Sequence, residues 1–303
     1  MKSPRPFDPD DVSTLPVVHL VSSGRPIFDG QVNPVWSAMV QTAHVTDPAI
    51  PVALKHIPST VKVAIELGCS LAATALKIPV PRGMLVLANP DDVPGLAEHG
   101  RPIPGLPEVL CYGSVLRWPE RARARTGDPL VDDYVWKRFC DSATAAPSAA
   151  WDELVANGDR HAGNFILEGS KYWLIDHDHA LKPLAKSVKA VLSSKTRADL
   201  VSYRAQRNQV AAQLVRRRPG DHAILDQPKA LSTRAKTLEG LVTMMGHWRS
   251  GNSMIDDVLS DAETVVRGII LRLPALALLL DARLAGPQSS LQWTSPTRPL
   301  FEP

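Results

Sequence analysis

The sequence predicts a mixed α+β protein with two lobes, a small β-rich N-terminal lobe and a mainly helical C-terminal lobe. Short apolar runs typical of strands dominate the first part of the chain, with one amphipathic helix among them. Helical patterns dominate afterwards, and a single hairpin interrupts them. The 303 residues suffice for two such units that share a cleft. We therefore assign residues 1–113 to the N-terminal lobe and residues 114–303 to the C-terminal lobe.

Strand-like runs and one helix make up the predicted N-terminal lobe. Strands are expected at residues 15–21, 35–45, 50–57, 84–88 and 109–116. Thr60 is a suitable N-cap for a helix that continues to about Lys77, where Pro79 and Pro81 end it. Residues 89–107 hold many Pro and Gly residues and are expected to form an exposed loop.

Helices dominate the predicted C-terminal lobe. They are expected at residues 130–141, at 149–156 and in most of the chain after 184, with a hairpin at 165–175. A helix over residues 261–280 is expected at the centre of the lobe. Its apolar part is about thirteen residues long, which is short of the ~20 that a membrane span needs, so a buried core helix is favoured.

Composition narrows the choice of partners and compartment. The formal net charge of +3 is too small to indicate a nucleic-acid partner by itself. The basic region at 182–218 holds only one aromatic residue, Tyr203, so a solvated helical face is favoured over a nucleic-acid surface, and an acidic protein partner stays open. The three cysteines make no CxxC pair, which argues against a thiolate zinc site and a disulfide framework. The N-terminus also lacks the apolar core of a signal peptide, and reduced cysteines in a cytoplasmic protein are therefore expected.

The chemistry of the chain is concentrated between residues 157 and 179. Asp159 is followed, after four intervening residues, by Asn164, and an apolar hairpin then leads to Asp176. The hairpin brings its two ends together, so Asn164 and Asp176 can share one ion. Carboxylate and amide oxygens suit magnesium. Phosphoryl-transfer enzymes use this layout, with the first Asp facing the acceptor group.

This run resembles a known family. Asp159-Arg160-His161 with Asn164, followed by Ile175-Asp176, is similar to the loop shared by phosphatidylinositol kinases and bacterial HipA-like kinases, distant relatives of protein kinases. With the preceding helix at 151–157, it looks most like the smaller HipA-related bacterial kinases. The resemblance is strong over about residues 151–180. It implies a two-lobed protein kinase-like fold that binds ATP and Mg²⁺ between its lobes.

The resemblance also implies roles for individual residues. Asp159 matches the catalytic Asp, Asn164 a magnesium ligand and Asp176 the metal-binding Asp, while His161 supports the catalytic loop. Asp176 is followed by His177-Asp178 where protein kinases have Phe-Gly, so Asp178 could compete for the metal or add to its binding. The implied acceptor is a protein Ser or Thr, and the implied partner is a cognate regulator or antitoxin.

The N-terminal lobe offers the matching phosphate-binding groups. Val52-Ala53-Leu54-Lys55 is close to the V-A-I-K pattern that holds the ATP phosphates, and Glu66 is the only acid between Lys55 and Lys77, which makes it the candidate partner of Lys55. A G-x-G-x-x-G loop is absent. Ser22-Ser23-Gly24 and Gly30–Asn33 both lie between the first two strands, and we take Ser23 and Gly24 as the phosphate contacts.

Three alternatives to a protein kinase stay open. The lack of a G-x-G-x-x-G loop is compatible with a nucleotide-binding pseudokinase or regulatory protein. A lipid or small-molecule acceptor fits the same loop motif. A metal-dependent phosphohydrolase would need His161, His177 and His179 to converge on one ion, but alternation along a strand points the last two away from the carboxylates of Asp176 and Asp178.

Overall fold

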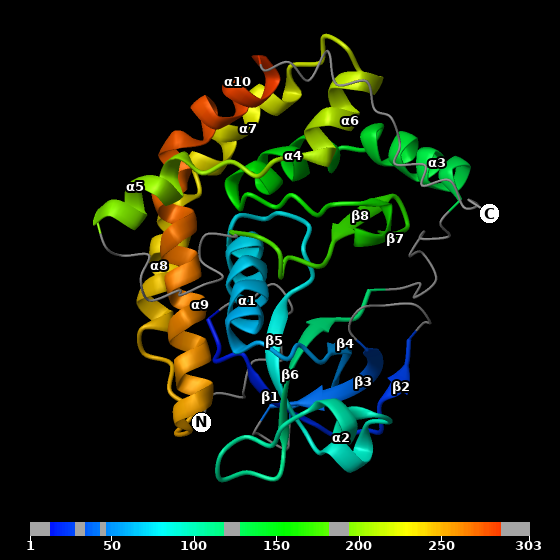
Figure 1. Ribbon diagram of the computed structural model, residues 1–303, viewed down its shortest axis with the longest axis vertical. Coiled ribbons are helices and arrows are strands. Elements are labelled where there is room, and N and C mark those ends of the chain that lie inside the picture. The colour runs from blue at the N-terminus through cyan, green and yellow to red at the C-terminus, as the bar shows by residue number, and fades with distance from the viewer. Residues whose placement is uncertain (1–12, 28–33, 43–46, 118–127, 182–193, 286–303) are drawn as a thin grey trace, which may run out of the picture.

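The computed structural model describes residues 13–27, 34–42, 47–117, 128–181 and 194–285. It is a mixed α+β structure, as expected, with a sheet at one end and most helices at the other (Figure 1). The strands are β1 (Val17–Leu20), β2 (Arg25–Pro26), β3 (Val35–Gln41), β4 (Ile50–Lys55), β5 (Gly83–Ala88), β6 (Val109–Val115), β7 (Phe165–Glu168) and β8 (Lys171–Leu174). The helices are α1 (Thr60–Ala75), α2 (Leu96–His99), α3 (Pro129–Cys140), α4 (Ala145–Leu154), α5 (Ser194–Ser202), α6 (Gln209–Arg217), α7 (Ala223–Ser232), α8 (Ala235–Met245), α9 (Ser253–Arg272) and α10 (Leu276–Ala285).

The larger sheet has the order β1-β5-β6-β4-β3-β2. An additional antiparallel pairing of β1 with β3 closes five of these strands into a ring of hydrogen-bonded neighbours. Alternating side chains point into the ring, so the strands β3 and β4 show a buried residue at every second position. The expected exposed loop at 89–107 is partly wrong, because Val93 and Leu96 are buried and belong to the core of this ring.

Helix α1 lies between the sheet and the C-terminal helices. Its N-cap is Ser59, whose hydroxyl accepts the Lys62 N–H, so the expected cap at Thr60 is wrong by one residue. Twelve of its residues are buried, which explains why its sequence is apolar on several sides. Helix α9 runs alongside it (Figure 1).

The contact between α1 and α9 depends on Gly68. A Cβ placed on Gly68 would lie 2.7 Å from the Cβ of Val265 and 2.8 Å from the carbonyl oxygen of Ala262. The absence of a side chain therefore lets the two helix backbones approach closely. The same hydrophobic cluster contains α1 and the C-terminal helices. The core is thus continuous across the proposed boundary at 113/114, and that boundary stays a prediction.

Substituting Gly68 tests this close packing. We expect Gly68→Ala to lower the free energy of unfolding by about 1–2 kcal/mol, because overpacking outweighs the gain in helix propensity. Urea denaturation of both proteins measures the change. Gly240→Ala on α8 is the matched control, since nothing lies within 4 Å of its added Cβ, and it should raise stability. Equal stabilisation by both substitutions would contradict the close contact.

The helical end differs from expectation in one place. The single helix expected at 261–280 is instead α9 and α10, separated by a 3-10 turn that contains Pro274. Proline lacks the N–H that would continue the helical hydrogen bonds. No helix in the described part of the chain is long and apolar enough to span a membrane. The cysteines Cys69, Cys111 and Cys140 are buried free thiols.

Candidate active site

Lys55 is the last residue of β4 and reaches out of the sheet toward the loop after β8. Its Nζ lies 2.5 Å from Oδ1 of Asp176 and 4.0 Å from Oδ2 of Asp178. The side chain of Lys55 is largely buried, at 14% exposure. The structure therefore brings together two residues that are 121 positions apart in the chain.

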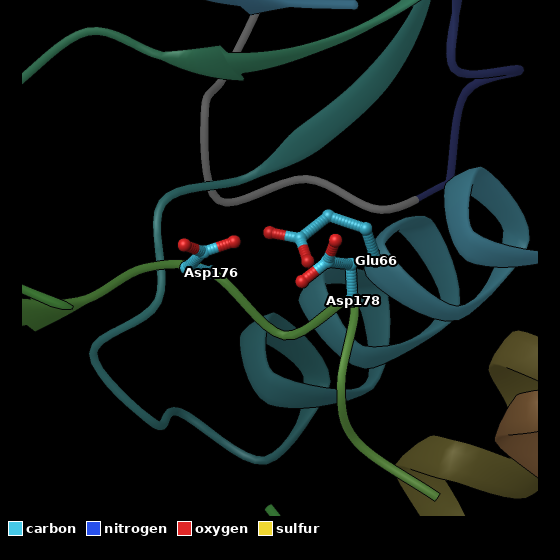
Figure 2. A group of neighbouring side chains, drawn as sticks. All are labelled: Glu66, Asp176 and Asp178. Atoms are coloured by element: carbon cyan, nitrogen blue, oxygen red, sulfur yellow. The ribbon is translucent and has the colours of Figure 1, made fainter. Parts of the chain in front are cut away.

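Three carboxylates surround this point. Glu66 from α1 and Asp176 and Asp178 from the loop after β8 point toward one another (Figure 2). One ligand oxygen from each lies within 4.8 Å of the others, and we call the three residues the acidic cluster. Among the described residues this is the one group of acids, histidines or cysteines with metal-site spacing, and it contains no histidine. Asp178 thus shares the site with Asp176, which the sequence left open.

Burial and mutual repulsion shape the charges of the cluster. Burial raises the pKa of Glu66 to about 8, and Asp176 and Asp178 add to the rise while Lys55 opposes it. Burial lowers the pKa of Lys55, but Glu66, Asp176 and Asp178 outweigh burial and raise it overall. Burial and the neighbouring aspartates therefore favour the protonated form of Glu66, while Lys55 favours its ionised form. A divalent cation would favour its ionised form.

Glu66 does not form the direct ion pair with Lys55 that we expected. Among the described residues, the ion pairs of Lys55 go to Asp176 and Asp178. Oε2 of Glu66 instead accepts the backbone N–H of His177 at 2.5 Å. This bond ties α1 to the loop that carries the two aspartates, so Glu66 positions the loop as well as contributing charge.

The backbone around the cluster is strained. Asp176 has φ of +68°, a conformation that Asp tolerates better than most residues. Ala156 and Leu181, which flank the same region of the chain, also have positive φ values of 48° and 46°. Each such residue costs on the order of 1 kcal/mol and persists only where the surrounding structure enforces it. Strain of this kind concentrates at functional sites.

Asp159 and Asn164 lie on the loop between α4 and β7. Asp159 is exposed. Its backbone N–H donates to Oδ1 of Asn157 at 3.1 Å. Nδ2 of Asn164 donates to the Asp159 carbonyl at 3.2 Å. Oδ1 of Asn164 is buried and has no hydrogen-bond partner. Because such an orphaned oxygen is costly, it fits a cation ligand.

His161 has a local structural role. Its Nδ1 accepts the backbone N–H of Gly163 at 3.1 Å and thereby caps the 3-10 helix Ala162–Asn164. The residue after this helix begins β7, so the cap fixes where Asn164 lies. This placement is compatible with the expected support of the loop, whose role in activity stays a prediction.

A buried arginine connects the loop to the acidic cluster. Arg160 donates to both carboxylate oxygens of Asp152 on α4, from Nε at 3.0 Å and from Nη2 at 2.9 Å. Its Nη1 donates to the carbonyl of Ile175, immediately before Asp176, at 2.6 Å. Both side chains of the pair are fully buried. Arg160 therefore holds the loop that carries Asp159 and the segment that carries Asp176 in one arrangement.

His177 completes this buried network. Its Nε2 accepts from the indole N–H of Trp151 at 3.1 Å and faces Nη2 of Arg160 at 3.0 Å. Two donors on Nε2 require the neutral imidazole with its proton on Nδ1. Burial and the charge of Arg160 hold the pKa of His177 well below its usual range. The imidazole of His177 is consequently unavailable to the carboxylates of the acidic cluster, which receive only its backbone N–H.

Ser23 and Gly24 lie away from Lys55. The register pairs Val35 of β3 with Lys55, whereas Ser22 contacts Met39 at the other end of β3. Gly24 precedes β2, which is separated from β4 by β3, and a Cβ on Gly24 would lie 3.4 Å from the Cβ of Trp36. The N–H of Gly24 already donates to the carbonyl of Asp92 at 2.9 Å. The structure does not bring Ser23 and Gly24 to the acidic cluster, and the alternative loop residues Gly30–Asn33 lie outside the described residues.

Two further contacts lie at the site and were not predicted from the sequence, one made by Lys62 and one by Arg160 with Asp152. Lys62, in the first turn of α1, places its Nζ 3.4 Å from Oδ2 of Asp178. The pair of Arg160 and Asp152 was also missed, although an acid inside the apolar run of residues 145–156 is a detectable signal of a buried partner. Lysines, carboxylates and an unpaired amide oxygen are groups that could hold a divalent cation and an anionic ligand.

Comparisons with known proteins add limited information. No family model matches the chain, and no curated protein matches it. Among solved structures, the chain is similar to the crystal structure of a Helicobacter pylori proinflammatory kinase, CtkA, with 12% identity and a TM-score of 0.49 over 88% of this chain and 99% of that chain. Similarity at this level does not assign a fold family, so the geometry of the cluster supports the function proposed below.

Proposed function

We propose that this protein is a two-lobed kinase that uses ATP and Mg²⁺ to phosphorylate a hydroxyl group, with protein Ser or Thr as the acceptor. The observation that carries the proposal is the meeting of Lys55 with Asp176 and Asp178, beside Glu66 and close in the chain to the unpaired oxygen of Asn164. A lysine from the sheet and carboxylates from the loop after the hairpin are the groups that phosphoryl transfer requires.

Each residue has a separate task in this proposal. Lys55 would contact the α and β phosphates of ATP, and Glu66 would hold the loop of Asp176 in place through the His177 N–H. Asn164, Asp176 and Asp178 would hold the metal ion, since their oxygens fit magnesium. When bound, Mg²⁺ would offset the negative charge of the phosphates. Asp159 would align the acceptor hydroxyl and accept its proton.

The alternatives differ in what supports them. A nucleotide-binding pseudokinase is motivated by the engaged N–H of Gly24 and by the lack of a glycine-rich loop. A metal-dependent phosphohydrolase would need three converging histidines, but His177 is buried against Trp151 and Arg160, and His161 caps a 3-10 helix. His179 differs from expectation, because its Nε2 lies 3.8 Å from Oδ1 of Asp178. We keep a protein acceptor and a cognate regulator as proposals, and a lipid acceptor as the rival substrate class.

Replacing Asp159 tests the proposed catalytic role. We expect the purified protein, with Mg²⁺ and labelled ATP, to label itself or an added protein, and Asp159→Ala to lower the rate at least about a hundredfold, because general-base catalysis is lost. Asp226→Ala on α7 is the matched control, since this exposed carboxylate lies outside the site. Its rate should equal that of the wild type.

Two outcomes would overturn the assignment. Equal labelling by the wild type and Asp159→Ala would show that Asp159 has no catalytic role. Tight ATP binding without turnover, with Mg²⁺ and also with Mn²⁺, would select the pseudokinase. Circular dichroism of both variants confirms that each is folded, so that a loss of rate reports on chemistry.

A further inference from the structure

An irregular segment lies directly on the loop that carries Asp159. We call residues Leu200–Asn208 the platform segment; it connects α5 to α6 and includes the last turn of α5. A Cβ placed on Gly158 would lie 3.4 Å from the Cβ of Ala205 and 3.7 Å from the carbonyl oxygen of Arg207. The platform segment therefore borders the position where the proposed function places the acceptor hydroxyl.

Two buried arginines hold the platform segment in place. Arg272 of α9 donates to the carbonyls of Leu200 and of Tyr203, the latter at 2.9 Å. Arg283 of α10 donates to the carbonyl of Ala205 at 2.7 Å. Both arginine side chains are almost fully buried. The backbone carbonyls of Leu200, Tyr203 and Ala205 thus point inward and accept hydrogen bonds from the two arginines. This orientation of the backbone in turn limits the directions in which the exposed side chains of the segment can point.

The C-terminal end of the platform segment, at Asn208, is anchored as well. Asn208 caps α6 by accepting the N–H of Ala211, and its Nδ2 donates to the carbonyl of Ala149 on α4 at 2.8 Å. Arg207, immediately before this anchor, is consequently held at a defined place next to Gly158. The backbone that carries Arg207 therefore needs little further ordering when the side chain binds a ligand.

Arg207 has an unused positive charge. Its side chain is exposed and has no ion pair or hydrogen bond with any described residue. Arg204, on the same segment, differs because its Nε lies 3.8 Å from Oε1 of the buried Glu153. Residues 194–208 contain three arginines and a single acid, Asp199. Arg207 therefore offers an exposed positive charge on the segment that borders Gly158.

We propose that Arg207 binds an acidic side chain of the acceptor protein, close to the hydroxyl that is phosphorylated. This inference rests on the proposed kinase function and names the substrate class for the same site. A guanidinium binds a carboxylate through two parallel hydrogen bonds, which gives orientation as well as affinity. None of the large apolar side chains that are exposed in the described structure lies on the platform segment, which favours a polar peptide over a membrane surface.

Charge reversal provides the test. Three fluorescent serine peptides are compared that carry Glu, Gln or Lys on both sides of the serine. For the wild type we expect a KM and an equilibrium Kd about tenfold lower for the Glu peptide than for the Gln peptide. Arg207→Glu should abolish this preference and favour the Lys peptide, with little change in kcat at saturation. Arg101→Glu, an exposed arginine before β6, is the control and should behave as the wild type.

The outcomes separate this inference from the proposed function. Turnover with no preference for the Glu peptide, or a preference that Arg207→Glu leaves intact, overturns the role of Arg207 and leaves the kinase in place. Arg207-dependent peptide binding without any turnover supports the docking role and overturns the kinase. Vesicles that contain phosphatidylserine form the third arm. Arg207-dependent vesicle binding without peptide preference would overturn the protein acceptor in favour of a lipid.

Discussion

Asp176→Asn should lower the rate of ATP-dependent phosphoryl transfer by at least about a thousandfold, because the proposed metal site loses a charged ligand and Lys55 loses its closest partner. Asn has nearly the same shape as Asp and also tolerates the left-handed backbone, so the φ of +68° can be kept. The change therefore removes charge and leaves the loop conformation intact. Steady-state rates at saturating ATP and Mg²⁺ measure the effect.

Metal binding gives a readout of Asp176→Asn that does not depend on turnover. Titration calorimetry with Mn²⁺ should show weaker binding by Asp176→Asn and also by Asp178→Asn, because both carboxylates belong to the acidic cluster. Asp226→Asn is the control and should bind Mn²⁺ as the wild type does. Unchanged affinity in both cluster variants would remove the metal site from this place. A loss in Asp178→Asn alone would reverse the assignment of the main ligand.

Arg160→Ala should lower the free energy of unfolding by about 3–5 kcal/mol, because it leaves the buried carboxylate of Asp152 without its partner. Urea denaturation measures the loss. Arg267→Ala on α9 is the matched control, since Arg267 also forms two hydrogen bonds with one carboxylate, that of Glu263, but is exposed. An exposed pair at this spacing contributes about 0.3–0.5 kcal/mol. Similar losses in both variants would contradict the buried network.

A second pair of substitutions separates stability from activity. Arg160→Met combined with Asp152→Leu replaces the ion pair with apolar side chains of similar size, which should recover part of the stability. We expect no recovery of phosphoryl transfer, because the Ile175 carbonyl and His177 lose the donors that hold Asp176 in place. Recovery of both properties would show that Arg160 contributes to stability alone.

Much of the fold was predictable from local patterns. Short apolar runs predicted β3 and β4, and the apolar runs around Glu168–Lys171 predicted the β7–β8 hairpin. Strand β2 was missed because its two residues give no periodic signal. The break between α9 and α10 was missed because the apolar pattern continues through it, although Pro274 marks the place. The ring closure of β1 on β3 is a long-range pairing that no local pattern encodes.

The candidate site was predictable to the extent that it follows from linear motifs. The motifs around Lys55 and Asp176 identified residues that the structure brings into contact. Strand register decides that Ser23 and Gly24 lie away from Lys55, and register depends on tertiary packing. Lys62 and the Arg160–Asp152 pair were missed for a similar reason, because which side of a helix or loop faces the cluster is decided by the assembled core.

The missing side chain of Gly68 has a mechanical consequence. Glu66 lies two residues before Gly68, so the same short stretch of α1 both supplies a carboxylate to the cluster and interlocks with Val265 of α9. Sliding or rolling α1 against α9 would press its backbone into the Val265 side chain and the Ala262 carbonyl, so the contact opposes such a movement. Displacing Glu66 by a movement of α1 would therefore require α9 to move with it.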